Sequence, residues 1–179
     1  MKIVILLGTI SQSALMDGDV LSKSDADFLD KATTRAHIDA DVVFAVEDPR
    51  YQGAKSSKIP IGAIRDERPR VLAEIAKAAP ECVIVLGPVA AKCVLDKGNS
   101  PPIADMRRQK HEIANIPCPV YFTYSLEEAS FKQGLLRWIN IDLMNIGLGT
   151  AKSIMPVYPV QKEPHAEIVE YLKGFGIVL

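Results

Sequence analysis

Residues 74–97 constrain the fold more than any other stretch, because a predicted helix, a buried strand and a second helix meet there at Gly87. Residues 83–86 form an unbroken apolar, β-branched run, typical of a parallel strand that is covered on both faces. Gly87 accepts a tight turn and Pro88 suits a first helical position, so a helix should follow the strand directly. Open α/β sheets bind their ligands at such junctions.

The rest of the chain repeats the order strand, loop, helix. Apolar runs predict strands over residues 3–7, 42–46, 83–86 and 119–124. Apolar residues at helical spacing predict helices over 25–36, 66–78 and 127–143. The last of these helices should carry Phe131 and Trp138 on its packed face. This order predicts a three-layer α/β/α fold with a mainly parallel four-stranded sheet, whose ligand edge includes the loop over residues 8–19.

We expect one domain over residues 1–146 and a linker or arm over residues 147–179. The second stretch is rich in Gly and Pro and contains one short helical pattern, at residues 165–173. The chain ends on apolar residues 177–179, and a natural terminus seldom does so unless the triplet pairs in a sheet. We therefore expect the arm to lead into a further domain of a longer protein.

Composition excludes several classes of protein. The three cysteines, Cys82, Cys93 and Cys118, lack CxxC spacing, which argues against a disulfide framework and against a zinc site. The apolar run after Met1 is too short for a signal peptide, and no segment is long enough to span a bilayer. We expect a cytoplasmic protein without a membrane partner.

Charge is unevenly distributed along the chain. Residues 50–111 carry 12 basic and 6 acidic side chains, whereas residues 1–49 carry 4 basic and 9 acidic ones. One face could therefore be basic and suited to a polyanion, although such blocks are also compatible with ordinary solvated faces. Within the basic block, Arg107, Arg108 and Lys110 could contact phosphates, or could lie on an exposed loop.

Taken in order, these landmarks resemble the uracil-DNA glycosylase superfamily, in particular the family 4-like branch associated with phage DNA polymerases. The resemblance spans roughly residues 2–143. Its most specific portion is residues 65–90, with the pattern Arg-x-x-x-Pro-x-x-x-x-Glu-Ile-x-x-x-x-Pro-x-x-x-x-x-Leu-Gly-x-x-Ala. Residues 104–124 begin with a basic stretch and then contain a predicted strand with the pattern Pro-Val-x-x-Thr-Tyr. They are similar to the segment that leads into the second catalytic motif of the family.

The resemblance implies two catalytic motifs, and this chain departs from both. The family's first motif supplies a polar residue that activates water, but residues 8–12 read Gly-Thr-Ile-Ser-Gln. The second supplies a His that stabilises the departing uracil anion, and Ser125 stands there instead. Each loss costs about 10²- to 10⁴-fold in rate, so we expect a domain that is not an active enzyme. The remaining catalytic candidates are Gln12, Asp17 and Ser125.

The same resemblance implies a nucleic-acid site at the strand ends. Its expected residues are Gly8, Thr9, Arg107, Arg108, Lys110, Tyr124, Ser125 and Leu126. Tyr124 could stack on a base, and Leu126 could enter a duplex as a wedge or serve as a hydrophobic staple at a helix start. We expect no metal and no cofactor, because the family's iron–sulfur branch uses four cysteines that this chain lacks.

The sequence therefore predicts a catalytically impaired, uracil-DNA glycosylase-like domain that binds DNA. By analogy with the family, it would be an accessory domain of a phage-type DNA polymerase, acting in replication or repair in the host cytoplasm. DNA and a polymerase or replication protein are the expected partners. One alternative is an active glycosylase that uses Gln12 or an Asp of the first loop. Another is a protein-interaction domain that has kept the fold without binding DNA.

Overall fold

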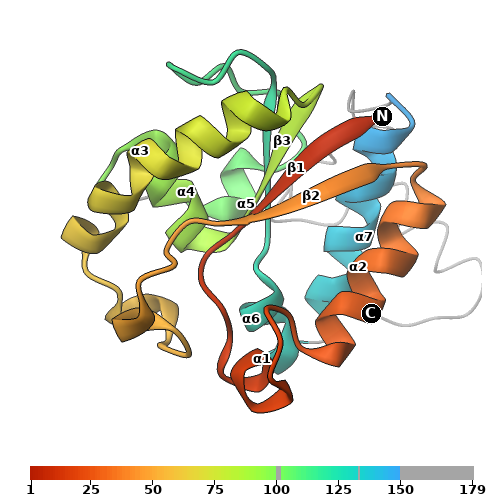
Figure 1. Cartoon of the computed structure of the whole chain (residues 1–179). Helices are drawn as coiled ribbons and strands as arrows, with labels where there is room; N and C mark the ends of the chain where they lie inside the picture. The colour runs from red at the N-terminus through yellow and green to blue at the C-terminus, as the bar shows by residue number, and fades with distance from the viewer. Residues whose placement is uncertain (100–101, 133, 150–179) are drawn as a thin grey trace, which may run out of the picture.

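Four parallel strands form one sheet within residues 1–99, 102–132 and 134–149, the part of the chain that the computed structural model describes (Figure 1). Their spatial order is β2-β1-β3-β4. The strands are β1 (Lys2–Leu7), β2 (Asp39–Phe44), β3 (Cys82–Leu86) and β4 (Val120–Thr123). After β1 the chain builds β2 on one side and then crosses to build β3 on the other. A topological switch point therefore lies between β1 and β3.

Helices cover both faces of the sheet, which confirms the predicted three-layer α/β/α fold. α3 (Ile61–Ala78) and α4 (Gly87–Leu95) pack on one face, and α2 (Lys23–Arg35) and α7 (Gly134–Gly147) on the other (Figure 1). The shorter elements are α1 (Gln12–Asp17), α5 (Ile103–Met106), α6 (Leu126–Phe131) and the 3₁₀ turns η1 (Pro49–Tyr51) and η2 (Ser56–Lys58). No helix in the described ranges combines the length and apolar character needed to cross a membrane.

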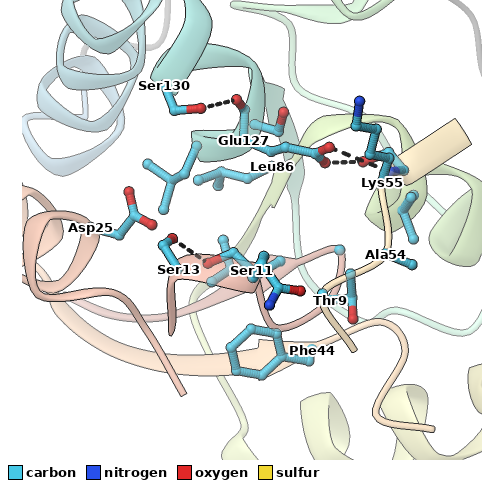
Figure 2. A pocket seen from close by; sticks show the side chains of 18 of the residues that line it. Thr9, Ser11, Ser13, Asp25, Phe44, Ala54, Lys55, Leu86, Glu127 and Ser130 are labelled. Carbon is cyan, nitrogen blue, oxygen red and sulfur yellow. Dashed lines mark hydrogen bonds between the residues drawn. The ribbon is translucent and has the colours of Figure 1, made fainter. Parts of the chain in front are cut away.

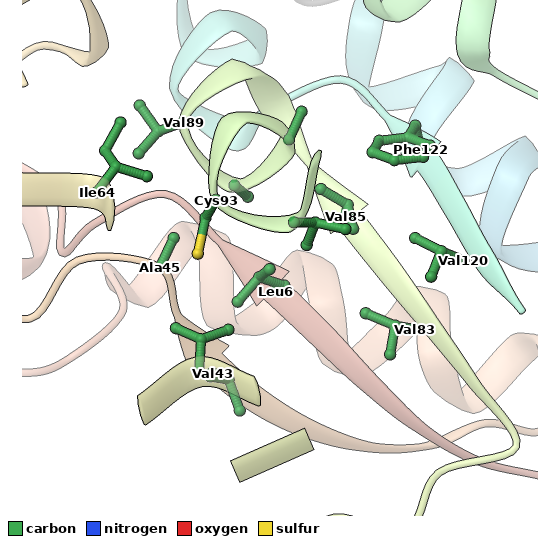
Figure 3. Close-up of a cluster of buried hydrophobic side chains, with 14 of the residues drawn as sticks. Leu6, Val43, Ala45, Ile64, Val83, Val85, Val89, Cys93, Val120 and Phe122 are labelled. Carbon is green, nitrogen blue, oxygen red and sulfur yellow. The ribbon is translucent and has the colours of Figure 1, made fainter. Parts of the chain in front are cut away.

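Alternate side chains of the central strands enter two separate cores. Val4 and Leu6 of β1 pack beneath α3 and α4, together with Val85 of β3 (Figure 3). Ile3 and Ile5 of β1 pack on the opposite side, against α2 and α7. All five side chains have an exposed fraction of 0%. Because both faces of these strands are buried, their sequences are continuous apolar runs rather than alternating ones.

All four predicted strands are present, and β2 differs most from its prediction. It begins at Asp39, three residues before the predicted start, and ends at Phe44 rather than at residue 46. β2 is an edge strand whose first half is largely exposed, with Asp39 and Asp41 facing solvent. An apolar-run criterion misses the first half of such a strand, because charged residues are tolerated at the edge of a sheet.

The helices differ most from the predictions at three places. The loop expected over residues 8–19 contains α1, which Ser11 caps by accepting a hydrogen bond from the Ala14 N–H at 3.2 Å. α3 begins at Ile61 rather than at residue 66. The closing helix is divided into α6 and α7, because Lys132 has non-helical backbone angles (φ −131°, ψ 80°). Phe131 at the end of α6 is consequently 80% exposed instead of packed.

The predictions for the arm concern residues that are not described. The short helix over residues 165–173 and the pairing of residues 177–179 both lie outside the described ranges. The same holds for the expected continuation into a further domain.

Gly87 sits where β3 passes directly into α4, and two features require a glycine there. Its φ of 84° is in the left-handed region that L-residues rarely adopt. A Cβ at this position would also overlap the Cβ of Ser125, at the start of α6. The predicted strand-to-helix turn is confirmed, and its glycine additionally lets two segments of the ligand edge approach each other.

Replacing Gly87 with Ala should lower the free energy of unfolding by about 2–4 kcal/mol, because the backbone strain and the overlap with Ser125 act together. Gly62→Ala is the matched control, since nothing lies within 4 Å of the added methyl group. That control should be neutral or stabilising by up to about 1 kcal/mol. Urea unfolding measures both variants, and equal stabilities would contradict the role given to Gly87.

Candidate functional site

A cavity of about 360 Å³ lies at the carboxyl ends of the strands, where parallel α/β sheets bind ligands (Figure 2). Segments that follow all four strands line it: residues 8–13 after β1, 53–56 after β2, 88–89 after β3 and 125–131 after β4. Residues 20–25, before and at the start of α2, complete the wall. The cavity therefore lies at the edge of the sheet where the sequence predicted a ligand site.

Two hydrogen bonds to backbone carbonyl oxygens hold the loops after β1 and β2 together. The Gly53 N–H donates to the Ile10 carbonyl oxygen at 2.8 Å, and the Thr9 hydroxyl donates to the Tyr51 carbonyl oxygen at 3.4 Å. Gly8 approaches α4 closely, because a Cβ added to it would lie 3.2 Å from the Val89 Cβ. Gly8 and Thr9 both line the cavity, Gly8 against the Val89 side chain and Thr9 held by its hydroxyl.

Ser125 lines the cavity, but its hydroxyl caps a helix. Its Oγ accepts a hydrogen bond from the Glu128 N–H at 3.0 Å, and the Glu128 carboxylate accepts one from the Ser125 N–H at 3.5 Å. This reciprocal pair is a capping box, which starts α6. Ser125 therefore has a structural role at the position where the family's catalytic histidine was expected.

Glu127 is a cavity residue that the sequence analysis missed. Its Oε1 accepts a hydrogen bond from the Ser56 N–H at 3.4 Å, and its Oε2 accepts a short one from the Ser56 hydroxyl (Figure 2). The two residues are separated by 71 positions in the chain. They join the loop after β2 to α6 across the cavity. No local pattern signals such a pair, because Ser56 lies in a polar stretch and Glu127 resembles an ordinary acid in a first helical turn.

The predicted candidates Gln12 and Asp17 lie in different surroundings, and the cavity has a further carboxylate in Asp25. Asp25, in the first turn of α2, lines the cavity and accepts a hydrogen bond from the hydroxyl of the N-cap Ser22 at 2.7 Å. Gln12 also lines the cavity, with an exposed side chain. Asp17 does not line it, and its carboxylate accepts a hydrogen bond from the Lys23 N–H at 3.0 Å. Of the three predicted catalytic candidates, the structure brings Gln12 and Ser125 to the cavity.

Arg107 is buried rather than free to contact phosphate. Its side chain is 8% exposed, and Nε and Nη2 each donate to a carboxylate oxygen of Asp142 at 2.8 Å. The guanidinium also lies over the rings of Tyr124 and Trp138, at 4.7 and 5.0 Å from their centroids. The Thr123 hydroxyl donates to the same Asp142 carboxylate. This network joins β4 to α7. Within it Asp142 neutralises the positive charge of Arg107, which was expected to contact the phosphates of DNA.

The remaining predicted nucleic-acid residues are also divided between the cavity and the β4 edge of the sheet. Arg108 packs over Trp138, 4.9 Å from the ring centroid, and Lys110 is exposed, 3.9 Å from the Glu112 carboxylate. Arg108, Lys110 and Tyr124 do not line the cavity. Leu126 does line it, and at 8% exposed it packs in the core beside α7 rather than projecting as a wedge.

No group of three or more His, Cys, Asp or Glu side chains in the described ranges is arranged to hold a metal ion. The cysteines are free thiols. Burial raises the pKa of Cys82 to about 12 and that of Cys93 to about 11, and it also raises the pKa of the half-buried Cys118. Cys82 and Cys93 are core residues of β3 and α4, where a free cysteine packs as a small apolar side chain.

Comparisons with protein-family models and with curated proteins found no match to this chain.

Asp142→Ala should lower the free energy of unfolding by about 3–5 kcal/mol, because it leaves the buried guanidinium of Arg107 without its partner. The double variant Arg107→Met, Asp142→Leu should recover most of this loss, since it removes both charges. Lys110→Ala, at an exposed position, should change stability by less than about 0.5 kcal/mol. Chemical unfolding of the three proteins tests the network, and an unchanged stability of Asp142→Ala would refute it.

The cysteines should react with a thiol reagent in an order set by burial. The thiolate is the reactive form, so a pKa raised above the working pH slows the reaction. At pH 8, Cys118 should be modified first, whereas Cys82 and Cys93 should react only when the protein unfolds in urea. Mass spectrometry of the modified peptides measures the order. Modification of all three thiols at one rate in the folded protein would contradict it.

Proposed function

We propose that this chain is a uracil-DNA glycosylase-like domain that binds single-stranded DNA by taking one unpaired base into its cavity, without cleaving the glycosidic bond. It would serve as an accessory domain in a phage-type DNA replication system. The observation that carries the proposal is the cavity itself, which the loops after all four strands form at the switch-point edge of the sheet.

The size and walls of the cavity suit a flat, polar-edged ligand such as a nucleobase. Its volume of about 360 Å³ falls within the range of small-molecule sites, about 300–1,000 Å³. Phe44, Leu86 and Leu126 supply apolar surface for the faces of a ring, and serine hydroxyls and Glu127 supply polar groups for its edge. Lys55, exposed on the cavity wall, offers an ammonium group near the phosphates of an inserted nucleotide (Figure 2).

The arrangement of the expected catalytic candidates argues for binding without hydrolysis. Ser125 uses its hydroxyl in the capping box, and Asp17 lies outside the cavity. Gln12 lines the cavity but is neutral, and an amide cannot accept the proton of an attacking water as a carboxylate can. The groups that the resemblance assigns to water activation and to uracil-anion stabilisation therefore lack clear replacements among these three residues.

One observation favours the alternative of an active hydrolase. Asp25 and Glu127 both place carboxylates on the cavity wall, and a carboxylate can act as a general base towards water. The same experiment separates the alternative from the proposal, because an active enzyme would release free uracil from a uracil-containing oligonucleotide.

The test is binding of a fluorescent single-stranded oligonucleotide, with uracil release measured in parallel at stoichiometric protein. We expect salt-sensitive binding and no release. Ser13→Trp, which places a bulky side chain at the cavity, should weaken binding by about tenfold or more, comparable to one lost stacking contact of about 1–3 kcal/mol. Ser57→Trp is the control, because this exposed residue of η2 does not line the cavity.

Three results would contradict the proposal. Uracil release that Glu127→Gln abolishes would favour the active glycosylase. Absence of binding would favour a protein-interaction domain. Equal binding by Ser13→Trp and Ser57→Trp would place the DNA site elsewhere on the molecule.

A further inference from the structure

We infer that the cavity selects bases that present an exocyclic amino group, and prefers cytosine to uracil, because Glu127 and its neighbours offer hydrogen-bond acceptors to the edge of the base. This inference rests on the proposed function and adds to it the chemical class of the bound base. The base it favours differs from the uracil that the family resemblance implies.

The Ser56–Glu127 pair fixes a carboxylate at the cavity wall. Both oxygens of Glu127 accept hydrogen bonds from Ser56, one from its N–H and one from its hydroxyl. A carboxylate has about four lone-pair sites, so these two bonds hold its orientation and leave acceptor capacity for a ligand. The Ser56 hydroxyl donates its one hydrogen bond to Glu127, so towards a ligand its oxygen can act only as an acceptor.

Other hydroxyl protons around the cavity are also committed within the protein. Ser130 donates to the Glu127 carbonyl oxygen at 2.7 Å, and Thr9 donates to Tyr51. The second carboxylate of the wall, Asp25, lies away from Glu127 in Figure 2 and adds further acceptors. Gln12 and Lys55 bring N–H donors to other parts of the wall, but around Glu127 the hydroxyls of Ser56 and Ser130 both donate within the protein. This part of the wall therefore presents mainly acceptor oxygens, and a base edge that binds it well must bring N–H donors.

Cytosine and uracil differ at the group that would meet this wall. Cytosine carries an N4 amino group, and Glu or Asp accepting from this amino group is a recurrent pairing in nucleic-acid recognition. Uracil carries an O4 acceptor at the same place, which would face the carboxylate without a proton between them. An unmatched polar contact of this kind costs about 1–3 kcal/mol, or about 5- to 150-fold in affinity.

The experiment uses the full chain and two single-stranded oligonucleotides of abasic residues with one central nucleotide, either dC or dU. The phosphates are identical, so a difference in affinity reports on the base alone. Fluorescence anisotropy at fixed salt should show the dC oligonucleotide binding at least about fivefold tighter.

Glu127→Gln should reduce this preference to within about twofold, because an amide offers both a donor and an acceptor. Glu112→Gln is the matched control: its side chain is 89% exposed, it lies outside the cavity, and it should leave the preference unchanged. Ser56→Ala supplies a second test that keeps the carboxylate and removes the hydroxyl that orients it. It should also reduce the preference.

The outcomes separate this inference from the proposed function. Equal binding of the two oligonucleotides, tighter binding of dU, or a preference that survives in both Glu127→Gln and Ser56→Ala would overturn the inference while leaving base binding intact. Failure of both oligonucleotides to bind more tightly than a fully abasic one would overturn the proposed function together with it.

Discussion

The close approach of Gly87 and Ser125 is the constraint on which the candidate site depends. Because Gly87 has no side chain, the start of α6 lies directly against the turn from β3 into α4. The capping box of Ser125 then fixes the first turn of α6, and Glu127 within that turn reaches Ser56. A backbone requirement at one glycine therefore positions side chains from two separate loops, those after β2 and β4, around the cavity.

Charged side chains in the core of the protein and at the cavity lie in different parts of the fold. At the β4 edge, Arg107 and Asp142 neutralise each other in a buried pair, with the aromatic rings of Tyr124 and Trp138 against the guanidinium. At the carboxyl edge of the sheet, Glu127 is half-buried and bonded to a neutral serine, so it keeps acceptor capacity for a ligand. This difference explains why a basic stretch of sequence need not mark the binding surface.

Sequence reasoning found the fold because the signals for it are local. The apolar run of β3 and the Gly87 turn each follow from residues within a few positions of one another. The site was only partly predictable, because its decisive contacts are not local. Ser56 and Glu127 are 71 positions apart, and Arg107 and Asp142 are 35 apart, so neither pair leaves a periodic or compositional signature.

We propose that the ligand binds in the cavity at the carboxyl edge of the sheet, and not at the basic residues 107–111 beside β4. Amide chemical-shift mapping of the isotope-labelled protein, titrated with a short single-stranded oligonucleotide, tests this most directly. We expect the largest shifts at four residues that line the cavity: Thr9, Gly53, Ser56 and Glu127. Shifts confined to residues 108–111, with the cavity amides unmoved, would contradict it.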